Sequence, residues 1–289
     1  MKAKWLIESG LFLDTEPELL RILKEKGYEV KTLKYIPFDD DLINHCAKLY
    51  DNDNECVVFY GSLNFARKLR KLQWIPGVYG DYEKYKCTSY YPVFGDLLVH
   101  NNYIMMPYGD LLRRKEYLFE TFGHIFLRPD SSTKEFTGMV LDWNNFEDGI
   151  KLAGFYDVEP DLLVVVSEAK ELSSEYRFVV VNQEVISGSL YRDWSKKGDA
   201  TSVDFVLRNS GSVKEGCKDK KVWKFAQECA KKYNPEIAWT LDIAEMDDGT
   251  YGVLEVGCFS SAGMYGNDLN IIVDKISEAA VKEWEEYFN

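Results

Sequence analysis

The pattern of secondary structure changes part-way along the chain. Over about the first 80 residues, short apolar strand patterns alternate with helix patterns, beginning with a strand at Lys4–Glu8. A helix is expected to start near Asp14 and end at Gly27, because acids and Pro17 are typical of a first helical turn and glycine of a helix end. Such alternation favours a parallel sheet, so the sequence predicts a small α/β lobe here. Further strands are expected at 28–35 and 55–60, and further helices at 41–49 and 64–72.

Strand patterns dominate from residue 125 onward. Asn182-Gln183 separates two of these strands and predicts a tight hairpin, and Asp247-Asp248-Gly249 predicts a second hairpin. Outside a helix expected at 111–122, residues 74–124 show no clear periodicity. The expected strands are 125–128, 139–141, 161–167, 175–182, 184–191, 238–244 and 251–256, and further helices are expected at 218–233 and 269–287. The fold class is therefore expected to be α+β.

Charge and composition exclude several classes of protein. The net charge of −13 disfavours general nucleic-acid binding, since an acidic surface repels a phosphate backbone. The N-terminus has no signal-peptide pattern, and no apolar run approaches the roughly 20 residues that span a bilayer, so we expect no membrane partner. The six cysteines and three histidines show no zinc-site spacing. Free thiols fit a reducing compartment, and we expect a cytoplasmic protein.

A segment rich in hydroxyl groups follows the strand that begins at residue 125. Arg128 ends this strand, and Ser131, Ser132, Thr133, Lys134 and Thr137 precede Gly138. Hydroxyls, backbone N–H groups and a lysine are the groups that bind a polyphosphate. The glycine spacing of a P-loop is absent. From these residues alone, the segment is either a phosphate-binding loop or a surface turn.

A second candidate is the corner Ser167-Glu168-Ala169-Lys170, where a buried strand runs into charged residues. Glu175 and Arg177 follow on the next strand. Glu168, the backbone near Ala169 and Glu175 are suited to a purine and a ribose, because these need backbone edges and carboxylates. The alternative is a connecting corner with a solvated ion pair, and the residues alone favour neither. A turn at Gly61-Ser62, between a strand and a helix, is a weaker candidate for binding an anion.

The third candidate is a pair of acids on adjacent strands of the second hairpin. Asp242 and Glu255 have apolar neighbours, and two such acids can share one face of a hairpin. Burying both is costly unless a positive charge neutralises them. Mg²⁺, which prefers carboxylate and phosphate oxygens, is the expected partner. The alternative is that both acids point outward.

The order of these segments resembles the ATP-grasp superfamily. More specifically, the chain resembles the clade common in bacteriophages, in which arginine replaces the usual first nucleotide-binding lysine. The resemblance covers about residues 55–270, and its motifs are Trp74–Val78, Leu111–Lys115, Phe126–Pro129, Lys134–Gly138, Glu175–Phe178 and Ser261–Gly266. It implies an ATP-grasp fold in which two α+β lobes hold ATP, preceded by an N-terminal α/β lobe. The expected domains are 1–100 and 101–289, the latter with a small lobe at 125–182 and a C-terminal lobe at 183–289.

The resemblance also implies a role for each candidate residue. Arg128 and Lys134 would contact phosphates, and Lys170 would lie near the adenine or the phosphates. The corner at Ser167, Glu168 and Ala169 would meet the adenine, Glu175 the ribose, and Arg128, Lys134 and Arg177 would be catalytic. Asp242 and Glu255 would hold Mg²⁺. The implied activity is ATP-dependent ligation of a carboxylate to an amine or thiol through an acyl phosphate, with release of ADP and phosphate. The acceptor and donor are open: small molecules, peptides and proteins all fit.

One position departs from the family pattern. The family usually places asparagine two residues after the metal-binding glutamate, and this chain has Gly257 there. A second metal ion is therefore in question, and a non-catalytic nucleotide-binding regulator is the alternative function. A kinase on the same scaffold ranks third. If the gene is phage-encoded, the protein would act in the host cytoplasm.

Overall fold

The computed structural model describes residues 1–289 except residues 40, 51–53, 134, 155–157, 195–211 and 289. The described chain forms two compact units: residues 1–81, 174–243 and 255–289 form the first, and residues 82–173 and 244–254 the second. Three strands continue from one unit into the other: β9 (Leu172–Val181), β12 (Ala238–Met246) and β13 (Tyr251–Cys258). The expected domain boundary near residue 100 stays a prediction.

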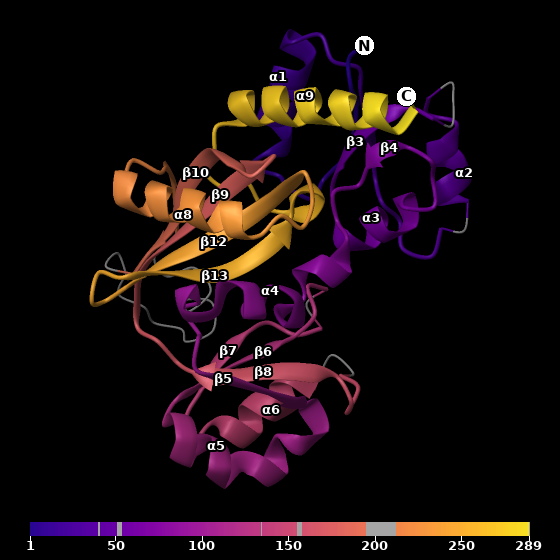
Figure 1. The fold of residues 1–289 in the computed structure, drawn as a ribbon. Coiled ribbons are helices and arrows are strands. Elements are labelled where there is room, and N and C mark those ends of the chain that lie inside the picture. The colour runs from indigo at the N-terminus through magenta and orange to yellow at the C-terminus, as the bar shows by residue number, and fades with distance from the viewer. Residues whose placement is uncertain (40, 51–53, 134, 155–157, 195–211, 289) are drawn as a thin grey trace. The chain divides into compact units, whose positions relative to one another are not determined.

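The N-terminal sheet of the first unit is parallel, as the alternating pattern predicts. Its strand order is β2-β1-β3-β4. Its elements are β1 (Lys4–Glu8), α1 (Glu16–Glu25), β2 (Val30–Leu33), α2 (Leu42–Ala47), β3 (Cys56–Tyr60), α3 (Leu63–Leu69) and β4 (Ile75–Gly77). The C-terminal helix α9 (Leu269–Phe288) packs on α1, β3 and β4 (Figure 1). The indole of Trp5 donates a hydrogen bond to the hydroxyl of Ser277 on α9 at 3.1 Å. Residues from both ends of the sequence therefore pack in one hydrophobic core.

The second sheet has the strand order β11-β10-β9-β12-β13. Its remaining strands are β10 (Glu184–Asp193) and β11 (Ser212–Gly216). Asn182 and Gln183 both have positive φ, at 50° and 61°, so the β9–β10 hairpin turns with the twist that flanking strands prefer. Between β12 and β13, Gly249 has a φ of 78° and closes the second expected hairpin.

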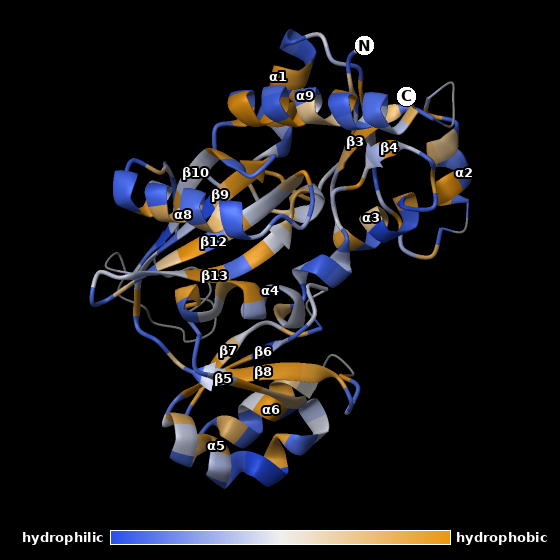
Figure 2. Cartoon of the chain, viewed as in Figure 1, coloured by the Kyte–Doolittle hydropathy of each residue, from blue (hydrophilic) through white to orange (hydrophobic). Residues whose placement is uncertain are grey.

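Helix α8 (Lys220–Lys232) covers β10. The Asp219 side chain accepts a hydrogen bond from the Lys221 N–H and caps the helix start. Its buried residues recur at helical spacing, and they are Val222, Ala226, Cys229 and Ala230. Figure 2 shows hydrophobic and hydrophilic residues alternating along α8 and α9, as expected of helices with one buried face.

The second unit contains an antiparallel sheet with the order β5-β8-β6-β7. Its strands are β5 (Tyr103–Pro107), β6 (Ile125–Pro129), β7 (Met139–Leu141) and β8 (Leu163–Glu168). Its α-helices are α4 (Cys87–Phe94), α5 (Lys115–Phe122) and α6 (Phe146–Gly154), and its 3₁₀ turns are η1 (Tyr82–Tyr85), η2 (Gly95–Leu97), η3 (Tyr108–Asp110) and η4 (Leu112–Arg114). The predicted helix at 111–122 thus begins as a 3₁₀ turn and becomes α-helical at Lys115. Within the described residues, no helix has the length and apolar character needed to span a membrane.

Candidate functional site

A buried ion pair joins two of the predicted site residues in the first unit. Arg177 on β9 donates to both carboxylate oxygens of Asp242 on β12, from Nε at 2.8 Å and from Nη2 at 2.6 Å. Only 13% of the Arg177 side chain and 4% of the Asp242 side chain are exposed. Arg177 Nη1 also donates to the Gly263 carbonyl at 3.2 Å. The guanidinium therefore supplies the positive charge that a buried Asp242 requires.

Two tyrosines cover this guanidinium. The rings of Tyr191 and Tyr265 stack with centroids 4.7 Å apart, and the guanidinium carbon of Arg177 lies 5.7 Å and 5.0 Å from their centroids. Gly263 and Tyr265 both belong to the segment after β13, and Tyr265 has a φ of 50°. This segment contacts Arg177 at two points, the Gly263 carbonyl and the Tyr265 ring. Sequence reasoning did not assign Tyr191, because nothing local links it to Arg177.

Glu175, predicted to bind a ribose, has both oxygens occupied by protein donors. Its carboxylate accepts hydrogen bonds from Tyr191 Oη at 2.7 Å and from Trp194 Nε1 at 3.1 Å. Burial raises the pKa of this carboxyl, against the lowering effect of these donors and of Arg192. A ribose hydroxyl would therefore bind Glu175 beside these donors or in place of one of them.

The predicted metal ligands lie on neighbouring strands, Asp242 on β12 and Glu255 on β13. Each carboxylate oxygen of Asp242 accepts one bond from Arg177 and retains lone-pair capacity, and Glu255 is half-buried. Oxygen donors of this kind suit Mg²⁺. A β-carbon added at Gly257 would lie 2.8 Å from Thr240 Oγ1, so a neighbouring hydroxyl occupies the space that a side chain would need. Asp242 and Glu255 thus fit a divalent cation as two of its oxygen ligands.

Arg128 and the charged corner lie in the second unit. Arg128 on β6 donates from Nη1 to the Leu254 carbonyl at 3.4 Å. At the end of β8, Lys170 Nζ lies 2.7 Å from Glu168 Oε2, and the Ala169 N–H donates to the His124 carbonyl at 3.0 Å. Ser167 is fully buried, and its hydroxyl donates to the Phe126 carbonyl at 3.4 Å. The corner therefore contains an ion pair between Glu168 and Lys170, which is the alternative that the sequence analysis left open. Contacts of the corner with a nucleotide stay a prediction.

The hydroxyl-rich loop after β6 is held by its own hydrogen bonds. The hydroxyls of Ser131 and Thr133 are 2.5 Å apart, and Thr133 Oγ1 donates to Glu135 Oε1 at 2.6 Å. Ser132 donates to the Tyr82 carbonyl at 3.2 Å. Lys134, predicted to bind phosphate, lies outside the described residues.

The weaker candidate for binding an anion is the turn at Gly61-Ser62. Its two N–H groups donate to Ser260 O and Glu8 Oε2, so both already have protein acceptors, as in a strand-to-helix turn.

His100 lies in the second unit, next to the strand β6 that carries Arg128, and it was not assigned as a site residue from the sequence. Its ring stacks on Phe126 with centroids 4.4 Å apart, and Nδ1 lies 3.2 Å from the Glu168 carbonyl. Burial lowers the pKa of His100 to about 4, helped by the charges of Arg128 and Lys170 and opposed by the bond to the Glu168 carbonyl. The neutral ring supports the strand that carries Arg128.

The depressed pKa of His100 leads to a testable pH dependence. An unfolded histidine titrates near 6.5, so the unfolded chain binds the proton more readily than the folded chain does. This contribution to stability is present above about pH 6.5 and is lost as the pH falls towards 4, amounting to about 3 kcal/mol. In ¹H–¹³C NMR spectra, one of the three histidine rings should titrate near pH 4 and disappear in His100→Gln. A His100 ring that titrates above 6 would contradict the burial argument.

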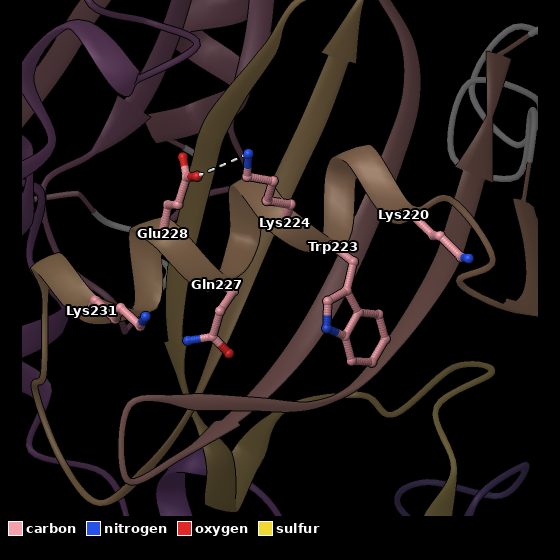
Figure 3. Close-up of a pocket in the computed structure, with 6 residues that line it drawn as sticks. All are labelled: Lys220, Trp223, Lys224, Gln227, Glu228 and Lys231. Carbon is pink, nitrogen blue, oxygen red and sulfur yellow. Dashed lines mark ion pairs between the residues drawn. The ribbon is translucent and has the colours of Figure 1, made fainter.

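A shallow pocket on the outer side of α8 contains none of the predicted site residues. Its volume is about 360 Å³, and Figure 3 shows the six residues that line it, Lys220, Trp223, Lys224, Gln227, Glu228 and Lys231. Gln227 accepts a hydrogen bond from the Val185 N–H at 2.9 Å and donates one to the Gln183 carbonyl at 2.9 Å. These two bonds connect α8 to the β9–β10 hairpin.

Comparison with solved structures identifies several proteins with a similar fold. The ATP-grasp ligase PsnB shares 15% identity with a TM-score of 0.59, over 98% of this chain and 100% of that one. D-cycloserine synthetase DcsG shares 12% identity with a TM-score of 0.60, over 96% and 100%. The D-alanine–D-alanine ligase of Bacillus anthracis shares 14% identity with a TM-score of 0.60, over 99% of each chain. At these identities the likeness concerns the fold. No curated protein sequence matches the chain.

A family model matches the sequence itself, over residues 112–274, which is more than half of the chain. The match includes all of the predicted site residues, from Arg128 to Glu255. The expected ATP-grasp fold is thereby confirmed, and the chain belongs to the ATP-grasp domain, R2K clade family 2.

Proposed function

We propose that the protein is an ATP-dependent ligase that joins a carboxylate to an amine or thiol and releases ADP and phosphate. The observation that carries this proposal is the family match over residues 112–274, which contains the Arg177–Asp242 pair and Glu255. The fold is shared with several ligases, one of which was solved with ATP and another with Mg and ADP. PsnB was solved with a precursor peptide and AMPPNP, and another of these proteins is named a D-alanine–D-alanine ligase, so both peptides and small molecules stay open as substrates of this chain.

The proposed chemistry begins with transfer of the terminal phosphoryl group of ATP to a carboxylate. The nucleophile then attacks the acyl carbon, and phosphate leaves with the electron pair of the broken C–O bond. Arg128 and Lys134 bind the phosphates and offset the negative charge that develops on the transferring group. Arg128 would do so where other ATP-grasp proteins use a lysine. Asp242 and Glu255 hold Mg²⁺, which supplies further charge neutralisation at the phosphate oxygens.

Within this proposal, the remaining predicted residues bind the nucleoside. The backbone and side chains at Ser167, Glu168, Ala169 and Lys170 contact the adenine, and Glu175 contacts the ribose. Arg177 holds Asp242 in place through two charge-assisted hydrogen bonds and in this way orients a metal ligand. The resemblance to the phage-associated clade supports a phage origin and a place of action in the host cytoplasm.

Turnover should require ATP, a carboxylate and a nucleophile together. ADP release is measured with ATP and Mg²⁺ against pooled carboxylates and amines, including short peptides, and products are identified by mass. Lys134→Ala should lower kcat/KM by about 100-fold, because it removes a charge that stabilises the transferring phosphoryl group. Lys151→Ala, at an exposed lysine of α6, is the matched control. A phosphorylated product that never condenses would indicate a kinase, and tight ATP binding without turnover would indicate a regulator.

A further inference from the structure

Helix α8 concentrates positive charge in an acidic protein. The chain has a net charge of −13, yet residues 218–232 contain six lysines and only two acidic residues. These lysines are Lys218, Lys220, Lys221, Lys224, Lys231 and Lys232. A local excess of one charge attracts partners of the opposite charge, so this helix favours an anionic partner.

Four residues that line the pocket on α8 form one row along the helix. They are Lys220, Trp223, Gln227 and Lys231. Steps of three and four residues place side chains on one face of a helix. Figure 3 shows the indole and the amide on the same side of α8, whereas Lys224 and Glu228 pair with each other on the other side. The row therefore has a lysine at each end and an indole beside an amide in its middle.

The middle of the row is held in place by the protein itself. Trp223 packs edge-on against Phe178, with ring centroids 5.6 Å apart and an angle of 89° between the planes. A β-carbon at Gly188 would lie 3.1 Å from the Trp223 ring, so glycine at this position lets the indole lie close to β10. Both polar atoms of the Gln227 amide are bonded to the β9–β10 hairpin. A partner that lies along the row thus meets a surface that needs little ordering.

The row also offers hydrogen-bond donors to a partner. Lys220 and Lys231 are exposed, and neither ammonium group forms an ion pair with another described residue. Within the described part of the chain, the indole N–H of Trp223 has no acceptor. The two lysines are separated along the helix axis by about 16 Å, at 1.5 Å per residue. An extended peptide rises about 3.3 Å per residue, so carboxylates about five residues apart match this separation.

This surface fits the carboxylates of a peptide better than the phosphates of a nucleic acid. A nucleic-acid strand carries a negative charge about every 3.4 Å. The row has positive charge only at its two ends, Glu228 lies beside it, and the chain as a whole is acidic. A peptide can instead place an apolar side chain between two separated carboxylates. Such a side chain suits the indole of Trp223, which combines an apolar ring with a polar N–H.

We propose that this row on α8 is a docking surface for an acidic peptide segment of a partner protein, in which carboxylates about five residues apart flank an apolar side chain. The carboxylates pair with Lys220 and Lys231, and the apolar side chain lies on Trp223. The neighbouring lysines add to the attraction and speed association. None of the predicted nucleotide-binding or metal-binding residues lies in the row, so docking does not require ATP.

Fluorescence anisotropy of a labelled synthetic peptide tests the proposal, at about 50 mM salt, where attraction between exposed charges is only partly screened. The probe carries two pairs of glutamates, centred about five residues apart, with a leucine between them. Lys220→Glu together with Lys231→Glu should weaken binding about 10-fold or more, because both end charges are reversed. The matched control is Lys275→Glu together with Lys282→Glu on α9, which changes the net charge equally and should change binding less than about 2-fold.

Two altered probes test the chemistry of docking without changing the protein. Replacing the leucine by serine should weaken binding, because the indole then loses its apolar contact. Placing the two pairs of glutamates next to each other should also weaken binding, because one carboxylate pair can then reach only one end lysine. Equal binding of this second probe would indicate a diffuse attraction between charges and would overturn the proposal.

Three further results would also overturn it. One is undiminished binding in the variant with both end lysines reversed, and another is a lack of probe binding by the unaltered protein. The third is tighter binding of an oligothymidylate than of the peptide, which would assign the surface to a nucleic acid. Light scattering adds a last check, since a dimer that forms in the unaltered protein but not in that variant would assign the surface to a second copy of the chain instead.

Discussion

Replacing Arg177 by methionine should lower the free energy of unfolding by about 3–5 kcal/mol. The substitution keeps an unbranched side chain of similar reach but leaves the buried carboxylate of Asp242 without its two charge-assisted bonds. It also leaves the Gly263 carbonyl without this donor and removes the cation beside the stacked rings of Tyr191 and Tyr265. Urea unfolding at neutral pH, followed by far-UV circular dichroism, measures the loss.

Arg21 provides a matched control for this experiment. It also makes ion pairs at 2.6–2.7 Å, with Glu18 and Glu25, but its side chain is 50% exposed. Arg21→Met should cost far less than Arg177→Met, because water and salt screen an exposed pair. Adding Asp242→Leu to Arg177→Met should recover much of the lost stability, since no uncompensated charge then remains buried. A loss below 1 kcal/mol for Arg177→Met alone would show that water reaches Asp242.

The same ion pair shows what the sequence could and could not predict about the site. The order of the segments along the chain, from Arg128 through Glu175 and Arg177 to Asp242 and Glu255, was sufficient to indicate the family. The need for a positive charge beside Asp242 was also predictable from its apolar neighbours. Its source was not, because Arg177 is 65 residues away in sequence and only the pairing of β9 with β12 brings them together.

The fold was predictable where hydrophobic periodicity is strong. The strand at Lys4–Glu8 and the hairpin turn at Asn182-Gln183 both follow from local signals, and the structure has both. Helix α4 lacks such signals, because it contains Pro92 and its buried residues include Tyr90 and Tyr91, which are ambiguous between core and surface. Strand β5 was also missed, since its residues are only partly buried and show no alternation.

Replacing Glu255 by glutamine should lower turnover by about 100- to 1,000-fold while leaving the fold intact. Glutamine keeps the shape of the side chain but removes the negative charge that a divalent cation requires. Glu255 is only half-buried, so the unfolding free energy should change far less than in Arg177→Met. The expected size of the effect is that of losing one group that stabilises charge in the transition state. ADP release with an identified substrate pair measures it.

Two comparisons distinguish loss of a metal ligand from a general disturbance. Glu278→Gln on the exposed side of α9 removes the same charge from a carboxylate that pairs only with Lys275 among the described residues, and it should leave turnover unchanged. Raising the Mg²⁺ concentration should restore part of the activity of Glu255→Gln, because the remaining ligands bind the metal more weakly but still bind it. Full activity of Glu255→Gln at low Mg²⁺ would remove Glu255 from the metal site and leave Asp242 without the partner that its position on the hairpin predicts.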